Sequence, residues 1–320
     1  MSSYLTQYGE LKAISTFETY PDGQLKDCVL NERVDFNTPL GLLTPQYEHA
    51  GIRRKRIYSV SFFQNGKVSR IALNEQTEVE TPLGKFPTEL ITFYESGSIK
   101  RLFPLNGQIS GYWDEDDEYN LAHEFNFNFS FGSFKTKIIG IHFYENGTIQ
   151  SLTLWPKETI VIKTPIGEQS VRIGLSLHPG GSIKSFEPAN PINIITPIGL
   201  INSFDTTANG IIGDKNSLNF MENGMIKSLT TISTKITVIS HNNITKIYSP
   251  IQLIDVDEEE ISFQPLQIEF VHDKVLFNGQ DEYTIRENHF KIEPYDKPAQ
   301  DSCSDCASCT QCSPKILKIL

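Results

Sequence analysis

A turn motif centred on glycine recurs six times along the chain and constrains the fold more than any other feature of the sequence. The residues before the glycines are turn formers, since Asn, Asp and Gly tolerate positive φ. Apolar residues stand six positions before each glycine, and two and five positions after it. The six dipeptides are Asp22-Gly23, Asn65-Gly66, Ser96-Gly97, Asn146-Gly147, Gly180-Gly181 and Asn223-Gly224. This pattern predicts a series of tight β-turns.

A second turn motif, Thr-Pro-x-Gly, alternates with the first. Proline at the second position fixes φ, and glycine suits the fourth position of a turn. The copies are Thr38-Pro39-Leu40-Gly41, Thr81-Pro82-Leu83-Gly84, Thr164-Pro165-Ile166-Gly167 and Thr196-Pro197-Ile198-Gly199. The two glycines of a unit lie 18 residues apart in three of the units, and 20 residues apart in the unit of Gly147 and Gly167. Each unit is therefore predicted to be two turns joined by a strand of nearly constant length.

The apolar positions around each first-type glycine predict an irregularity in the strand that follows it. Positions six and four before the glycine share one strand face by the period of two. Positions two and five after it cannot share a face in a regular strand, so a bulge or a second small turn must intervene. The pattern alone does not place it.

Units of this kind cannot bury a face alone, but stacked in series they share one core. We therefore predict an all-β protein, built as an elongated antiparallel β-hairpin repeat array or solenoid. Helical periodicity is nearly absent. Only the last residues, Ile316, Leu317, Ile319 and Leu320, suggest a short amphipathic turn.

The first-type unit resembles the bacterial variety of MORN-type repeat. The residues that carry the resemblance are Phe143-Tyr144-Glu145-Asn146-Gly147-Thr148-Ile149 and Asn106-Gly107-Gln108-Ile109-Ser110-Gly111-Tyr112-Trp113. It covers the Asn-Gly half of each unit, whereas the Thr-Pro-x-Gly element is not part of that repeat. The resemblance implies a β-hairpin array used for protein or lipid contact, without catalysis.

Composition and spacing divide the chain into three predicted parts. A repeat array spans residues 1–240, with an insertion at about 107–140. A terminal β subdomain at 241–297 is expected to cap the array, and a flexible cysteine-rich tail follows at 298–320. Within the insertion, Phe125, Phe127, Phe129 and Phe131 alternate with polar residues. This alternation predicts a half-buried strand, and we favour a core strand over an exposed docking edge.

Charge and hydropathy argue against several functional classes. The 320 residues carry a formal net charge of −11, which argues against nucleic acid and anionic membranes as partners. The basic run Arg53, Arg54, Lys55 and Arg56 is interpreted as a solvated turn. No signal peptide is recognised at the N-terminus, and no apolar run is long enough to span a bilayer. A cytoplasmic, reducing location is the expectation, which favours metal ligation over disulfides for clustered cysteines.

Four of the five cysteines form the only segment with a recognisable pattern of metal-binding side chains: Cys303, Cys306, Cys309 and Cys312. Three interpretations stay open. The spacing resembles the ferredoxin pattern of a [4Fe–4S] cluster, although the last gap has two residues and Ser313 precedes Pro314. Four thiolates could instead bind Zn²⁺, but zinc sites usually draw their pairs from separated loops. The third interpretation is a disordered tail without a specific metal.

The remaining candidate groups have simpler explanations. Cys28 takes the position five residues after a glycine, where other units carry Ile, Leu or Phe, so we predict a buried core residue. His178 takes a position held elsewhere by Tyr, Phe or Met. The acidic residues Asp255, Asp257, Glu258, Glu259 and Glu260 could ligate a hard cation, but a solvated hairpin is favoured. The sequence contains no Gly-x-Ser-x-Gly, phosphate-binding glycine loop or His-Glu-x-x-His motif.

These observations support two hypotheses from different classes. The first is a non-enzymatic interaction or scaffold protein that binds a protein partner and carries a thiolate metal or iron–sulfur site in its tail. The second is an electron-transfer or enzyme-accessory protein, in which a [4Fe–4S] cluster in the tail is the working part. The sequence leaves the oligomeric state open.

Overall fold

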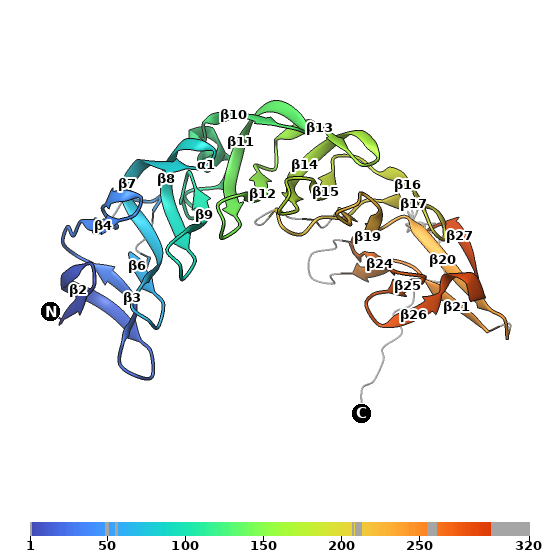
Figure 1. Ribbon diagram of the computed structural model, residues 1–320, viewed down its shortest axis with the longest axis horizontal. Coiled ribbons are helices and arrows are strands. Elements are labelled where there is room, and N and C mark those ends of the chain that lie inside the picture. Colours follow the sequence, from blue (N-terminus) through green and yellow to red (C-terminus); the bar gives the residue numbers. More distant parts are fainter. Residues whose placement is uncertain are drawn as a thin grey trace, which may run out of the picture.

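The computed structural model describes residues 2–48, 51–54, 57–206, 208, 213–242, 244–254 and 261–295. Within these ranges the chain is all-β, with antiparallel sheets and a single α-helix. Figure 1 shows a curved, extended arrangement, with the N-terminal strands at one end and β20, β21 and β27 at the other. No helix in the described ranges is long and apolar enough to cross a membrane.

Most strands belong to one 18-stranded antiparallel sheet. Its central strands, in the order in which they pair, are β1 (Ser2–Thr6), β2 (Gly9–Thr19), β3 (Leu25–Leu30), β6 (Val60–Phe62), β7 (Val68–Thr81), β8 (Gly84–Phe93), β9 (Ile99–Phe103), β11 (Gly132–Phe143), β12 (Ile149–Leu154), β14 (Gly167–Leu177), β15 (Ile183–Pro188), β18 (Leu218–Phe220), β19 (Ile226–Thr231), β24 (Leu266–Val271), β25 (Lys274–Phe277) and β26 (Asp281–Thr284). Each of the two remaining strands pairs with one long strand of this sheet: β10 (Glu124–Phe129) with β11, and β13 (Thr159–Thr164) with β14.

Four smaller antiparallel sheets complete the described fold. They are β4 (Phe36–Thr38) with β5 (Gly41–Leu43), β16 (Ile192–Thr196) with β17 (Gly199–Ser203), β22 (Ile251–Ile254) with β23 (Ile261–Gln264), and β20 (Thr234–Ser240) between β21 (Thr245–Tyr248) and β27 (Asn288–Pro294). The helix α1 spans Glu115–Leu121, and a short 3-10 helix, η1, spans Ile285–Glu287.

All six first-type glycines lie at hairpin turns, as predicted. Each has positive φ, from 78° at Gly66 to 94° at Gly97. In the β11–β12 hairpin the Gly147 amide donates to the Tyr144 carbonyl at 2.8 Å, and the other five turns repeat this bond. The left-handed conformation that these turns need is one that glycine adopts without steric cost.

The predicted irregularity is a β-bulge three residues after each glycine. In β12, Ile149 pairs with Phe143 and Ser151 pairs with His142, so Gln150 is the extra residue. The bulge turns Ile149 and Leu152 to the same face, where both are buried. The corresponding extra residues elsewhere are Lys26, Ser69, Lys100, Lys184 and Lys227.

Side chains at one position join successive hairpins. The Tyr94 hydroxyl donates to the Phe143 carbonyl at 2.8 Å, and the Tyr144 hydroxyl donates to the Leu177 carbonyl at 2.8 Å. Tyr20 makes the same bond to the Phe62 carbonyl at 2.9 Å. The His178 Nε2 lies 3.2 Å from the Phe220 carbonyl, so it takes the place of a tyrosine hydroxyl. These contacts cross from one hairpin to the next in addition to the strand pairing.

The second-type turns are closed by their threonines. Thr81 Oγ1 donates to the Gly84 carbonyl at 2.7 Å and accepts from the Leu83 amide at 3.1 Å. Thr38, Thr164 and Thr196 do the same in their turns. The turn Thr6–Gly9 also has this geometry, although it lacks proline and the sequence pattern did not identify it.

The second-type turns of Pro82 and Pro165, and the related turn Thr6–Gly9, contact first-type turns of hairpins further along the chain. The Gln7 amide donates to the Gly66 carbonyl at 3.1 Å. The ring of Pro165 lies 3.3 Å from the point where a Cβ on Gly224 would sit. This folding back buries the apolar residue two positions before each threonine against the sheet. These residues are Phe36, Val79, Ile162 and Ile194.

Three features of the insertion and core can be compared with expectation. The favoured core interpretation of the phenylalanine strand is confirmed, because Phe127 and Phe131 are buried and Phe125 and Phe129 pack on the core. Cys28 is fully buried, as predicted. The helix α1 was not predicted, because its seven residues are too few for a visible period. It begins with a capping box between Asp114 and Asp117.

Candidate functional site

The cysteines predicted to bind a metal, Cys303, Cys306, Cys309 and Cys312, lie outside the described residues, as do Asp255, Asp257, Glu258, Glu259 and Glu260. Among the residues that the structure does describe, no group of three or more His, Cys, Asp or Glu side chains is placed to hold a metal ion. The candidate site must therefore be sought on the sheet itself.

One face of the large sheet carries a continuous line of polar side chains, which we call the polar row. Its members alternate along each strand with the buried apolar residues, and each pairs with the next member on the neighbouring strand. In lateral order they are Glu18, Asp27, Ser61, Arg70, Thr92, Arg101, His142, Ser151, Ser176, Ser185, Asn219, Ser228 and Glu269. Because paired strands lie about 4.8 Å apart, the row is an extended and regularly spaced surface.

Residues 213–217 cover the middle of the polar row. Their backbone and side chains bond to the strands beneath: the Gly213 amide donates to Thr153 Oγ1 at 2.7 Å, and Asn216 Nδ2 donates to Ser185 Oγ at 2.7 Å. The Ser217 amide donates to Glu187 Oε2 at 2.7 Å. Members of the row under this segment are buried, whereas those on either side are partly or fully exposed.

Asp214 is the centre of this covering segment. Its carboxylate accepts hydrogen bonds from Arg101 Nη2 and Ser151 Oγ, and lies 3.2 Å from His142 Nδ1. Burial opposes ionisation of the carboxyl group. However, the hydrogen bonds from His142 and Ser151 and the charge of Arg101 outweigh it, so the pKa of Asp214 lies well below its usual range. Asp214 therefore acts as an anionic anchor that ties three strands together.

The arrangement at Asp214 does not have the geometry of a nucleophilic triad. In such a triad the serine bonds to the histidine, and the acid orients the histidine from its other nitrogen. Here Ser151 bonds to the carboxylate, and the buried His142 Nε2 has no partner among the described residues. The cluster supports binding and positioning more than covalent catalysis.

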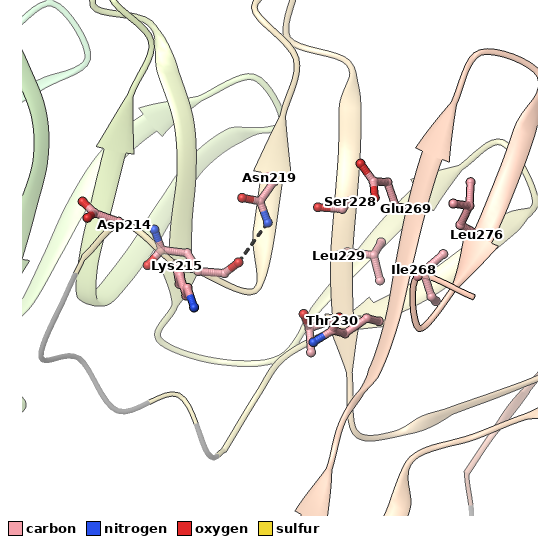
Figure 2. Close-up of a pocket in the computed structure, with 12 residues that line it drawn as sticks. Asp214, Lys215, Asn219, Ser228, Leu229, Thr230, Ile268, Glu269 and Leu276 are labelled. Atoms are coloured by element: carbon pink, nitrogen blue, oxygen red, sulfur yellow. Dashed lines mark hydrogen bonds between the residues drawn. The ribbon is translucent and has the colours of Figure 1, made fainter. Parts of the chain in front are cut away.

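Beyond residues 213–217 the polar row opens into a pocket of about 280 Å³. Figure 2 shows Asn219, Ser228 and Glu269 side by side on successive strands, with Asp214 and Lys215 at one side. The walls offer a carboxylate, an ammonium group, an amide and a hydroxyl. Such a mixture suits polar side chains of a partner.

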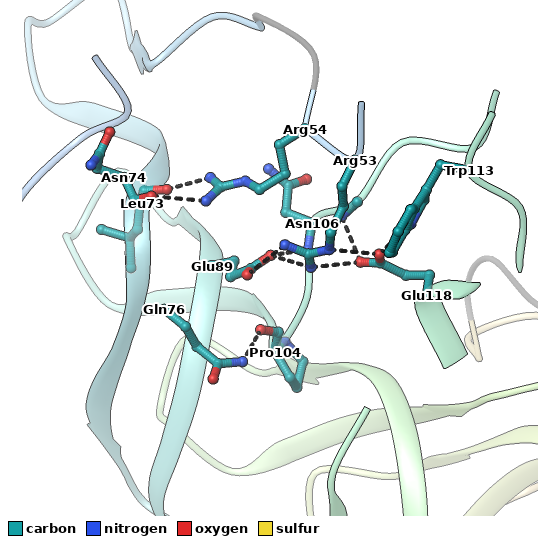
Figure 3. A network of polar contacts seen from close by, with 11 residues as sticks. Arg53, Arg54, Leu73, Asn74, Gln76, Glu89, Pro104, Asn106, Trp113 and Glu118 are labelled. Atoms are coloured by element: carbon teal, nitrogen blue, oxygen red, sulfur yellow. Dashed lines mark hydrogen bonds and ion pairs between the residues drawn. The ribbon is translucent and has the colours of Figure 1, made fainter. Parts of the chain in front are cut away.

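A second polar cluster fixes the insertion to the sheet. Arg53 Nε and Nη2 each donate to Glu118 at 2.8 Å, and Nη1 and Nη2 donate to Glu89 at 3.0 and 2.8 Å (Figure 3). Glu118 also accepts from the Gly107 amide at 2.7 Å and from Trp113 Nε1 at 2.8 Å. Burial alone would lower the pKa of Arg53, but its hydrogen bonds to Glu89 and Glu118 raise that pKa above its ordinary value. All four hydrogen-bond positions of the Glu118 carboxylate are occupied.

The interpretation of the basic run as a solvated turn is therefore wrong for Arg53 and Arg54. Arg54 is 4% exposed and donates to the carbonyls of Leu73 and Asn74. Arg53 is held between two carboxylates. Lys55 and Arg56 lie outside the described residues. The partners are 36 and 65 residues away, and local sequence could not reveal them.

The polar row was also missed, although a signal was present. The position between the two apolar residues that precede each first-type glycine holds Glu18, Ser61, Thr92, His142, Ser176 and Asn219. This regular polar position could have predicted one face of the sheet. The partner of His142 could not be predicted, because Asp214 follows an irregular segment.

Comparison of the chain with protein-family models, with curated proteins and with solved structures found no match. The fold and the two polar clusters are therefore the basis for any assignment of function.

Proposed function

We propose that this protein is a non-enzymatic β-repeat scaffold that binds a protein partner along the polar row. On this proposal the recurring hairpins are units of one elongated array, in which each unit contacts its neighbours. The hairpin-to-hairpin bonds of Tyr20, Tyr94, Tyr144 and His178 support equivalence of the units. The terminal strands would cap the array, since Ile292 of β27 lies beside Gly199 in the last second-type turn.

The observation that carries the proposal is the uninterrupted register of the polar row from Glu18 to Glu269. The uncovered stretches of the row on either side of residues 213–217 present side chains at fixed spacing, which suits an extended partner surface better than a small substrate. The row carries both charge signs: Glu18 and Glu269 lie at its two ends, and Arg70 lies between them. Opposite charges at separated positions set the orientation of a partner more than its affinity.

Co-purification from the native source, followed by reconstitution from purified components, tests this proposal. Glu269 and Glu124 are both exposed glutamates with a lysine neighbour, with side-chain exposures of 41% and 48%. Only Glu269 belongs to the polar row. We expect Glu269→Lys to weaken partner binding at least tenfold and Glu124→Lys to leave it unchanged. Equal affinities of the two variants would exclude the polar row as the interface.

The cysteine tail is a separate part of the proposal, and it rests on the spacing of Cys303, Cys306, Cys309 and Cys312. We infer that these thiolates bind a [4Fe–4S] cluster or Zn²⁺. Anaerobically purified full-length protein should carry iron and sulfide, or zinc, and protein lacking residues 301–320 should not. Brown colour that bleaches reversibly on reduction would favour the electron-transfer alternative. Equal metal content in the two proteins would exclude a metal site in the tail.

A further inference from the structure

The solvent-facing side of the β16–β17 hairpin carries an exposed apolar pair. Ile195 in β16 and Leu200 in β17 lie directly opposite each other, and their exposed fractions are 85% and 56%. Opposed side chains on one sheet face are close enough to form a single apolar surface. The neighbouring residues Ile194 and Ile201 are buried on the other face. The hairpin is therefore apolar on both faces, although only one face packs on the core.

The equivalent position is mostly polar in the other second-type hairpins. It is formed by the residue before the threonine and the residue after the glycine, which pair across the strands and are exposed in all four hairpins. The other pairs are Glu80 with Lys85, Lys163 with Glu168, and Asn37 with Leu42. Two of these pairs are oppositely charged. Two aliphatic residues at a position that is otherwise polar indicate a surface used for contact.

The described part of the chain ends beside this face. The Tyr295 amide donates to the Ser233 carbonyl at 2.8 Å, and Ser233 Oγ donates to Asn202 Oδ1 at 2.8 Å. Asn202 lies two residues from Leu200 in β17, so the two side chains share one face. Figure 1 shows β20 and β27 next to β17. Residues 296–320 therefore follow directly from the border of the apolar pair.

These following residues include a segment with a matching composition. Residues 315–320 read Lys-Ile-Leu-Lys-Ile-Leu, with four aliphatic side chains, two lysines and no acid. The rest of the chain carries a net charge of −11 − 2 = −13, so electrostatics favour the approach of this segment. The intervening residues 296–314 can span at most about 65 Å. A contact within one chain has an effective concentration in the millimolar range, so a weak contact suffices.

We propose that residues 315–320 dock on the exposed face formed by Ile195 and Leu200 and cover it with their aliphatic side chains. Residues 296–314, which contain the four clustered cysteines, would then form a loop anchored at both ends of its sequence. One anchor is Tyr295 and the other is the β16–β17 hairpin. The proposal depends neither on metal binding by the cysteines nor on partner binding along the polar row.

Carbene labelling of the full-length protein with a water-soluble diazirine tests this docking. Leu42 is the matched control, because it occupies the equivalent position in β5 and is 61% exposed, against 85% for Ile195. Each labelling rate is normalised to its value in denaturant. We expect Ile195 to be labelled at least threefold more slowly than Leu42, although Ile195 is the more exposed residue. Equal or faster labelling of Ile195 would overturn the proposal.

A double variant of the hairpin tests the contact from the side of the sheet. Ile195→Glu with Leu200→Lys copies the charged pair of the β7–β8 hairpin, so the fold should be kept. It should increase the labelling of Leu317 at least threefold. Leu42→Lys should leave the labelling of Leu317 unchanged. Unchanged labelling of Leu317 in the double variant would contradict the contact.

A double variant of the segment tests the contact from the other side. Leu317→Ser with Leu320→Ser should raise the labelling rate of Ile195 to at least that of Leu42. If Ile195 stays protected in this variant, something other than residues 315–320 covers the face and the proposal is wrong. Sedimentation velocity at the labelling concentration tests a second copy as the cover. A dimer whose dissociation exposes Ile195 would equally overturn docking within one chain.

Discussion

The ring of Pro82 lies 3.1 Å from the point where a Cβ atom on Gly147 would sit. Pro82 forms the tip of a second-type turn, and Gly147 closes the first-type turn of a later hairpin. The two kinds of turn recognised in the sequence are therefore in contact across the fold. The position of Pro82 depends on the length of the strand between Gly66 and Gly84, so a longer or shorter strand would move Pro82 away from Gly147.

The contact predicts different costs for alanine at two glycines with similar backbones. Gly147 and Gly66 have φ of 84° and 78°, and only Gly147 has a neighbour within 4 Å of the added Cβ. Left-handed backbone costs an L-residue about 1–2 kcal/mol, so both variants should lose stability. In urea unfolding, Gly147→Ala should lose about 1 kcal/mol more than Gly66→Ala. Adding Pro82→Ala should remove the difference, and equal midpoints without it would contradict the contact.

The bonds between hairpins predict opposite effects at two equivalent positions. Tyr94→Phe removes the hydroxyl that bonds to the Phe143 carbonyl and should cost about 0.5–1.5 kcal/mol. Phe63 takes the same position in the preceding hairpin, so Phe63→Tyr should reach the Phe93 carbonyl. It should then stabilise by up to about 1 kcal/mol. Chemical denaturation measures both, and a stabilising Tyr94→Phe would disprove the role of these bonds.

The anchor at Asp214 predicts a pH-dependent stability. Its pKa is lower in the folded chain than the ordinary value of 3.8, so its contribution is complete above that value. The contribution is lost as pH falls through the folded-state pKa. Asp214→Asn should cost roughly 2–3 kcal/mol at pH 7, below the 3–5 kcal/mol of fully buried pairs. The difference in unfolding free energy between Asp214→Asn and the unaltered protein should become smaller below pH 4. The exposed control Asp116→Asn should have almost the same unfolding free energy as the unaltered protein at every pH.

Burial raises the pKa of the Cys28 thiol to about 12, which predicts its reactivity. Thiolates are the reactive form, so at pH 8 a disulfide reagent should label at most four of the five cysteines in folded, metal-free protein. Cys28 should react only after denaturant is added. Cys28→Val should cost under about 1.5 kcal/mol and leave the native labelling unchanged. Labelling of Cys28 in folded protein would show that this part of the core opens.

Sequence alone determined the local features of the fold. The left-handed turns require glycine, the bulge follows from the unequal spacing of the apolar residues around Gly147, and alternation assigned Phe127 to the core. Each of these depends on residues within one hairpin. The cysteine spacing predicts a metal site by the same local logic, and that prediction stands outside the described residues.

Tertiary structure decided which polar groups meet. Arg53 bonds to Glu118 across 65 residues of sequence. Asp214 contacts His142 across 72 residues and Arg101 across 113. Such pairs depend on where the insertion and the segment around Asp214 fold over the sheet, and no periodic signal encodes that path. The conformation of a turn is determined by neighbouring residues, whereas the burial of a charged group depends on every element packed around it.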